Sequence, residues 1–165
     1  MSIYPNKEIS QCQIDLELNG YCIDSLNLPI DIKMAVDNED YQSLDTLMTR
    51  YLSNDHFIFN YLKQFSDFSE IEHIISLRES KNEWEEDGIW HDDGSRVLAF
   101  SLSLTKNSPI GGVLEFREKG LIESQKIPTP KYGEIIVFKT GTSGYEHKIN
   151  KVVEGRRLII AGWCT

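Results

Sequence analysis

The chain has 165 residues, which is enough for one domain and too few for two of ordinary size. Apolar residues make up 40% of it and charged residues 26%, which excludes a disordered, collagen-like or membrane-embedded chain. The 17 basic and 26 acidic residues give a net charge of −9, and so acidic a surface repels phosphate backbones, which argues against a nucleic-acid partner.

The three cysteines, Cys12, Cys22 and Cys164, show no CxxC spacing, and we interpret them as reduced thiols. The N-terminal residues contain no apolar segment of the kind found in a signal peptide. No apolar run approaches the roughly 20 residues that a membrane span requires. We therefore expect a soluble cytoplasmic protein with no membrane partner.

In the first part of the chain, polar and apolar residues alternate over residues 12–18, which predicts a half-buried strand. Asn19-Gly20 is a tight-turn pair, and residues 21–23 are typical of a return strand. The sequence therefore predicts a β-hairpin near the N-terminus.

The next segments change to a helical period. Apolar spacing predicts a helix over 41–52, with Asp37 or Asn38 as its N-cap, and a second helix through 57–65. Residues 71–79 fit a helix or a strand, and we interpret them as a strand because the chain that follows has β character.

From about residue 89 onward, short apolar runs recur roughly every ten residues between glycines and prolines, as in a sandwich or barrel. We expect a single domain over residues 1–165, in which residues 1–80 form the hairpin and support helices and residues 81–165 form the β core. The predicted strands lie at 96–105, 113–116, 135–138, 148–153 and 158–163.

The first candidate for chemistry is Trp90-His91-Asp92-Asp93-Gly94. In an extended segment His91 and Asp93 point to the same side and can bind one metal ion. His147, beside a predicted strand, is the candidate third ligand, and two histidines with one carboxylate form the facial triad of non-haem Fe(II) sites. Taken alone, HxD is also a chance tripeptide with a surface histidine, so the spacing leaves both interpretations open.

A second candidate is Arg157, ten residues after His147. Under strand alternation it shares a face with Ile159, Ala161 and Trp163. An arginine on the inner face of a small barrel requires a partner, and a carboxylate ligand would pair with it in bidentate fashion. The alternative is a salt bridge to one of the acidic residues, whereas Arg156 faces the other way and is expected at the surface.

Residues 89–163 resemble the 2-oxoglutarate- and Fe(II)-dependent oxygenases, most closely the prolyl-hydroxylase-like branch. The resemblance rests on the order, the spacing and the apolar pattern of several segments taken together, although each segment alone is weakly specific. These segments are His91-x-Asp93, the strand after Arg96, Gly111-Gly112-Val113-Leu114-Glu115-Phe116, Gly133-Glu134-Ile135-Ile136-Val137-Phe138, and His147 through Arg157 to Trp163.

The resemblance implies a mostly β fold with α-helices, in which N-terminal helices buttress a double-stranded β-helix (jelly roll). It implies His91, Asp93 and His147 as iron ligands and Arg157 as the partner of the distal carboxylate of 2-oxoglutarate. It also implies Fe(II) as cofactor, and 2-oxoglutarate and O2 as cosubstrates.

One position departs from the family pattern. Hydroxylases of protein prolines usually place a tyrosine on the strand after HxD to help hold that carboxylate, and Ser103 stands there in our alignment. Ser101, two residues earlier on the same face, is the alternative. This departure argues against a collagen-type or peptidyl-proline substrate.

The resemblance implies a dioxygenase that hydroxylates a small molecule or an amino-acid side chain, free or in a peptide, with release of succinate and CO2. The alternative is a cupin-like metal-binding jelly roll that acts as an isomerase, a hydrolase or a non-catalytic binding module. The acidic residues between 83 and 87 are typical of a solvated loop, and a second hypothesis is that they select a cationic substrate.

Overall fold

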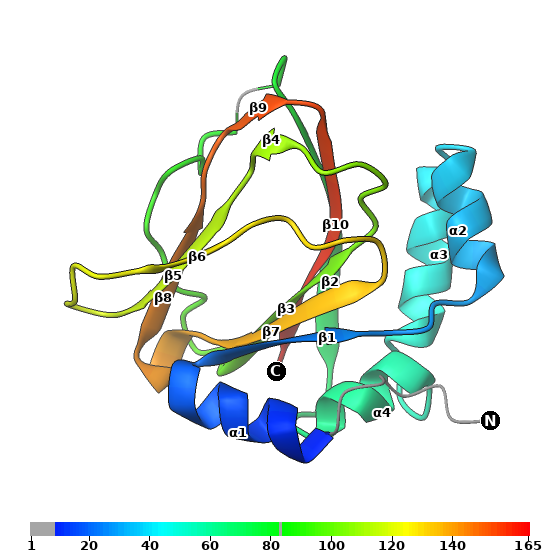
Figure 1. Cartoon of the computed structure of the whole chain (residues 1–165). Helices are drawn as coiled ribbons and strands as arrows, with labels where there is room; N and C mark the ends of the chain where they lie inside the picture. Colours follow the sequence, from blue (N-terminus) through cyan, green and yellow to red (C-terminus); the bar gives the residue numbers. More distant parts are fainter. Residues whose placement is uncertain (1–8, 83) are drawn as a thin grey trace.

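The computed structural model describes residues 9–82 and 84–165, and two antiparallel sheets face each other at its centre (Figure 1). A short ladder pairs β4 (Ile110–Gly111) with β9 (Val152–Glu154). The large sheet contains, in spatial order, β1 (Tyr21–Ser25), β7 (Glu134–Lys139), β3 (Leu98–Ser103), β10 (Arg156–Cys164) and β2 (Ile71–Glu79). The small sheet contains β6 (Gln125–Ile127), β5 (Leu114–Glu118) and β8 (Tyr145–Ile149).

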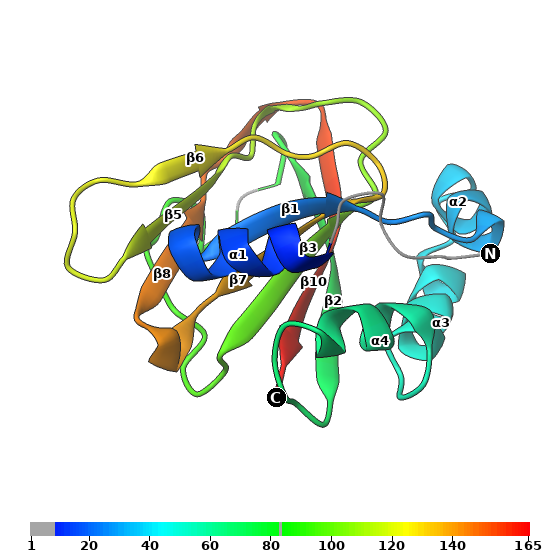
Figure 2. The ribbon, with the colours of Figure 1, turned by 60° about the horizontal axis from the view of Figure 1, so that its bottom comes forward.

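Four helices accompany the large sheet, and Figure 2 shows α1 and α4 in front of it. Their bounds are α1 (Ile9–Asn19), α2 (Ile30–Asp37), α3 (Tyr41–Tyr51) and α4 (Phe57–Lys63), and a 3₁₀ turn, η1 (Gly141–Ser143), precedes β8. No helix in the described part of the chain is long and apolar enough to cross a membrane.

Both faces of the large sheet are covered, and β3 shows this most clearly because all six of its residues are buried. Phe100 and Leu102 pack with the helices on the outer face. Ala99 packs between the sheets with Phe116 of β5 and Phe138 of β7. The prediction of a mostly β fold with helices is confirmed, and the inner face of this sheet is the one that carries the site.

The predicted strand over 12–18 is wrong, because these residues lie in α1. Cys12 and Leu16, four residues apart, are buried, whereas Ile14 and Leu18 are 50% and 75% exposed. The alternating pattern therefore fits the two-residue period of a strand, whereas the burial follows the period of a helix. Gly20 ends the helix with a φ of +80° and donates its N–H to the Leu16 carbonyl, as expected for a glycine that terminates a helix.

The interpretation of all cysteines as reduced thiols is also wrong. Cys12 of α1 and Cys22 of β1 form a disulfide, and only Cys164 is free and buried. The pairing depends on α1 folding back over β1, a contact that the predicted hairpin did not contain.

The other helices and strands predicted in the N-terminal half are present in the structure. The helices over 41–52 and 57–65 correspond to α3 and α4, and the strand over 71–79 is β2. The cap of α3 is Asp40, which accepts a hydrogen bond from the backbone N–H of Ser43, and not Asp37 or Asn38. Helix α2 and the short strands β4 and β6 were not predicted.

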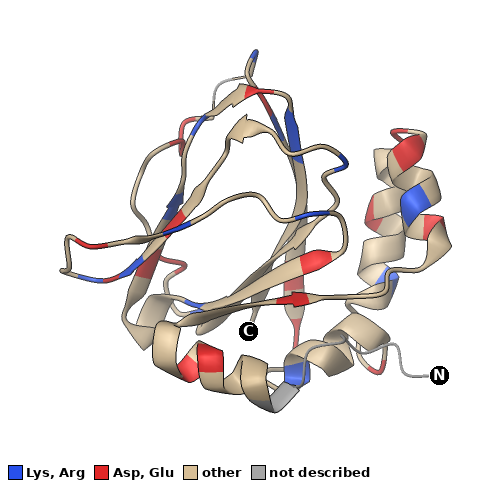
Figure 3. Cartoon of the chain, viewed as in Figure 1, with Lys and Arg blue, Asp and Glu red and all other residues tan. Residues whose placement is uncertain are grey.

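In the β half, the predicted strands at 96–105, 113–116, 135–138 and 158–163 correspond to β3, β5, β7 and β10. The predicted strand over 148–153 is divided between β8 and β9. Figure 3 shows acidic and basic positions interspersed along both halves of the chain.

Candidate functional site

Three predicted ligands come together beside β8. His91, Asp93 and His147 each offer one ligand atom, and these atoms all lie within 4.8 Å of one another. His147 is on β8, and His91 and Asp93 are on the segment that leads towards β3. Two imidazoles and a carboxylate are the donor set of non-haem Fe(II) facial triads, so these residues fit such a metal.

The backbone places these side chains without help from a metal. The N–H of His91 donates to the carbonyl of His147 at 3.0 Å, and the N–H of His147 donates back at 2.9 Å. The N–H of Asp93 donates to Oγ1 of the buried Thr140 at 3.1 Å. The sequence did not indicate the role of Thr140, because this hydrogen bond depends on how the end of β7 packs against residues 91–93.

The ring nitrogens of the histidines suit a ligand role. Nδ1 of His91 lies 3.0 Å from the carbonyl oxygen of Ile89, so Nδ1 donates to this oxygen and Nε2 is the nitrogen left for a metal. Nε2 of His147 lies 3.8 Å from Oδ2 of Asp93. Burial, reinforced by the nearby His91, lowers the pKa of His147 despite Asp93, and this favours the neutral imidazole that binds metals.

A cavity of about 230 Å³ opens between the two sheets beside these ligands. Arg157 lines it from β10 and is 2% exposed. A Cβ at Gly112 would lie 2.9 Å from Cδ of Arg157, so the second glycine of the Gly-Gly pair makes room for this side chain. The predicted inner-face position of Arg157 agrees with the structure, as does the exposed position of Arg156.

Unsatisfied polar atoms gather at this cavity. Among the described residues, seven buried side-chain atoms have no hydrogen-bond partner, and all but the hydroxyl of Tyr132 belong to residues that line it. Such atoms are rare in folded proteins and costly without a ligand. The six atoms are Arg78 Nε, Asp93 Oδ2, Ser101 Oγ, His147 Nδ1, and Nε and Nη1 of Arg157.

The two candidate serines have different surroundings. The hydroxyl of Ser103 donates to the Pro130 carbonyl at 2.7 Å, and this residue does not line the cavity. Ser101 does line it, and its hydroxyl has no partner. The structure therefore brings the alternative, Ser101, to the cavity with Arg157.

The remaining histidines lie elsewhere. His73 pairs with Asp45 of α3 at 2.9 Å, and His56 occupies the N-cap position of α4 without a capping hydrogen bond from its side chain. In the acidic segment, Asp87 pairs with Arg78, and Glu86 lines the cavity.

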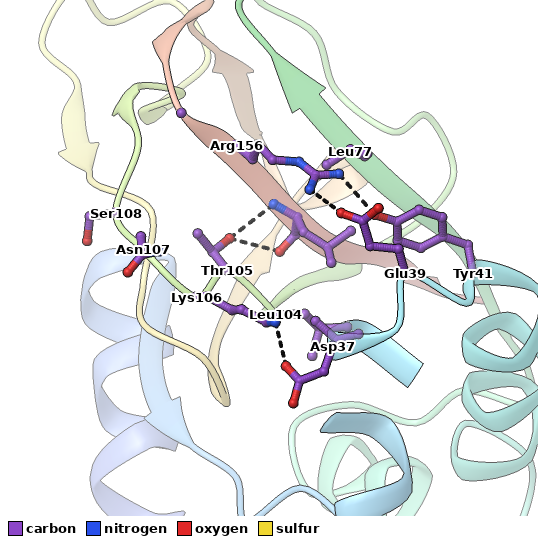
Figure 4. A pocket seen from close by; sticks show the side chains of 13 residues that line it. Asp37, Glu39, Tyr41, Leu77, Leu104, Thr105, Lys106, Asn107, Ser108 and Arg156 are labelled. Carbon is purple, nitrogen blue, oxygen red and sulfur yellow. Dashed lines mark hydrogen bonds and ion pairs between the residues drawn. The ribbon is translucent and has the colours of Figure 1, made fainter. Parts of the chain in front are cut away.

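A second cavity, of about 340 Å³, lies on the opposite face of the large sheet, towards α2 and α3. Its charged residues are paired with one another (Figure 4). Arg156 contacts Glu39 at 2.5 Å and donates to the hydroxyl of Tyr41, and Lys106 contacts Asp37 at 2.5 Å. This cavity therefore contains no unsatisfied charge that would require a ligand.

The family model described as the 2OG-Fe(II) oxygenase superfamily matches residues 73–165, more than half of the chain. The chain belongs to this superfamily, and it is a 2-oxoglutarate-dependent dioxygenase. The resemblance inferred from the sequence is confirmed, and with it Fe(II), 2-oxoglutarate and O2 as cofactor and cosubstrates. The cupin-like alternative is not supported.

Solved structures share the fold at low sequence identity. A prolyl-4-hydroxylase from Pseudomonas putida is 16% identical with a TM-score of 0.64, over 95% of this chain and 98% of that one. A 2OG-Fe(II) oxygenase-family oxidoreductase from Burkholderia pseudomallei is 12% identical with a TM-score of 0.67, over 96% and 90%. A Trichoplax adhaerens prolyl hydroxylase, in complex with a peptide of hypoxia inducible factor, is 13% identical with a TM-score of 0.62, over 96% and 94%. A search of curated proteins found no match.

Proposed function

We propose that this dioxygenase hydroxylates a small molecule or an amino-acid side chain, free or in a peptide, with release of succinate and CO2. His91, Asp93 and His147 hold Fe(II), and Arg157 pairs with the distal carboxylate of 2-oxoglutarate. The observation that carries this proposal is the cluster of unpartnered buried atoms, because Arg157 contributes to it and lines the same cavity as His91, Asp93 and His147.

The proposal includes the architecture. Residues 1–165 form one oxygenase domain, with a double-stranded β-helix buttressed by the helices. The facing sheets and the helices against the outer face of the large sheet support this assignment.

Bound Fe(II) supplies the redox chemistry that couples O2 to decarboxylation of the cosubstrate and oxidation of the substrate. The chain's own residues bind, orient and exclude water. His147 is neutral and buried, so it donates a lone pair without first losing a proton. Arg157 fixes the far end of the cosubstrate, and Ser101 donates a hydrogen bond beside it. Apolar Leu114 and Phe138 line the wall of the cavity and limit the entry of water.

Two observations bear on the substrate class. The complex of the Trichoplax adhaerens enzyme contains a peptide, which supports keeping an amino-acid side chain within the proposal. Ser103, which stands where hydroxylases of protein prolines usually have a tyrosine, does not line the cavity, and this supports a substrate other than peptidyl proline.

The test is an anaerobic titration of the protein with Fe(II) and 2-oxoglutarate, followed by the visible charge-transfer band of the chelate. We expect the band only when both components are present, and we expect His147→Ala to abolish it because two protein ligands remain. His73→Ala is the matched control, since His73 pairs with Asp45 away from the cavity. A band of unchanged intensity in His147→Ala, or no band in the wild-type protein, would contradict the proposal.

A further inference from the structure

The cavity contains a second buried guanidinium, that of Arg78. Arg78 lies on β2 directly opposite Arg157 in the register of β2 with β10. Directly opposite residues of an antiparallel pair place their side chains on the same face, about 5 Å apart at Cβ. Both side chains line the cavity, and Arg78 is 7% exposed.

The two guanidinium groups have one partly buried carboxylate beside them, that of Asp87. Arg78 pairs with Asp87 through Nη1, whereas Arg157 makes no ion pair among the described residues. The other acidic residue near Arg78 is Glu86, which is exposed at the wall of the cavity. Two buried positive charges, those of Arg78 and Arg157, therefore face the single partly buried negative charge of Asp87. One further carboxylate would balance them.

The electrostatics of Arg157 agree with this count. Burial and the nearby charge of Arg78, against a smaller opposing effect of Asp87, together lower the pKa of Arg157 to about 9. Burying two like charges side by side is costly unless a ligand compensates for them.

The contacts of Arg78 leave part of its guanidinium available. Nη1 pairs with Asp87, Cζ lies 4.6 Å from the centroid of the Trp84 ring, and Nε is buried with no partner. A guanidinium presents several N–H donors in a rigid fork, so it can pair with two carboxylates at once.

We propose that Arg78 is a second recognition residue for the distal carboxylate of 2-oxoglutarate, which bridges Arg157 and Arg78. Through Asp87 and Trp84, Arg78 then also ties residues 84–87 to the occupied cavity. This inference rests on the proposed function, since it assumes the cosubstrate subsite at Arg157.

A purely structural role for Arg78 makes a different prediction. If Arg78 only anchors residues 84–87 through Asp87, then removing either partner weakens cosubstrate binding to the same extent. If Arg78 contacts the cosubstrate, Asp87 is a competing anion beside it. Arg78→Met then weakens binding, whereas Asp87→Asn strengthens it.

The experiment measures the affinity of the anaerobic Fe(II) protein for 2-oxoglutarate, and for pyruvate, which lacks the distal carboxylate. We expect Arg78→Met to weaken 2-oxoglutarate binding by about ten- to a hundredfold and to leave pyruvate binding within twofold. We expect Asp87→Asn to tighten 2-oxoglutarate binding by about two- to fivefold. Arg78→Lys keeps the charge without the fork and should give an intermediate loss.

Arg117→Met is the matched control. Like Arg78, Arg117 pairs with a carboxylate, that of Glu146 at 2.7 Å, and stacks on a tryptophan, Trp90 at 3.8 Å. It does not line the cavity, so we expect its affinity for 2-oxoglutarate to stay within twofold of wild type.

Three results would overturn the inference: unchanged 2-oxoglutarate affinity in Arg78→Met, equal losses for 2-oxoglutarate and pyruvate, or equal losses in the Arg78 and Asp87 variants. If Arg78→Met does not fold, Arg78→Lys and Asp87→Asn decide by the same criteria. Failure of the proposed function is distinguishable, because Arg157→Met would then also leave the affinity unchanged.

Discussion

Two consecutive arginines on β10 have opposite surroundings, although they differ by one position in the chain. Arg156 points to the cavity near α2 and α3, where its guanidinium contacts Glu39, Glu79 and the hydroxyl of Tyr41. Arg157 points between the sheets, where Nε and Nη1 have no partner. Strand alternation alone sends the two side chains to opposite faces.

The comparison separates a structural charge from a functional one. A charge whose partners come from the chain itself contributes modestly to stability and needs no ligand. A buried charge without a partner costs stability and persists where a ligand compensates for it. Strands β2 and β10 contribute to the lining of both cavities, one on each face of the sheet. The two cavities therefore have different roles, and substitutions in them should change stability and 2-oxoglutarate affinity in opposite ways.

The largest effect is expected for Arg157→Met. Removing the buried guanidinium takes away the partner of the distal carboxylate, and we expect 2-oxoglutarate affinity to fall by about 3–5 kcal/mol, or more than a hundredfold. The ligand-free protein should become more stable by about 1–2 kcal/mol, because an uncompensated buried charge is replaced by an apolar side chain.

Calorimetric titration of 2-oxoglutarate and urea denaturation of the ligand-free protein measure the two effects separately. A variant that loses both affinity and stability would show that Arg157 is a structural residue like Arg156, and the contrast between the faces would fail.

A smaller effect is expected for Thr140→Val, which tests how the ligand side of the cavity is built. The variant keeps the shape of the side chain and removes the Oγ1 acceptor of the Asp93 N–H. Because Asp93 is then held less firmly, we expect Fe(II) affinity to fall about tenfold, the usual lower range for residues that support metal ligands. Competition with a chelator measures it, and unchanged affinity would show that the pairing of His91 with His147 suffices.

The smallest effect is expected for Arg156→Met. It removes contacts to Glu39 and Glu79, but the side chain is 47% exposed, so we expect stability to fall by less than about 1 kcal/mol. Affinity for 2-oxoglutarate should stay within twofold of wild type. A large loss of that affinity would mean that the two faces of β10 are coupled, and the comparison would need revision.

Much of the β half followed from local pattern. Alternation around Arg157 placed this residue on the inner face of its strand, and the spacing of His91 and Asp93 placed their side chains on one side. Both predictions depend only on the alternation of side chains along one extended segment, which can be read from the order of the residues.

The N-terminal region shows the opposite case. The alternation of Cys12, Ile14, Leu16 and Leu18 is compatible with two periods, and the packing of α1 on β1 selected the helical one. The disulfide between Cys12 and Cys22 follows from that packing, so the sequence pattern alone could not reveal it.

The sequence by itself determined the residue types of the site and the strand faces on which they lie. The tertiary structure decided which serine reaches the cavity, that Thr140 supports Asp93, and that Arg78 lies opposite Arg157. These relations depend on the register between strands distant in the chain and on side-chain burial, since a hydrogen bond or an uncompensated charge is a property of the neighbours that packing brings together.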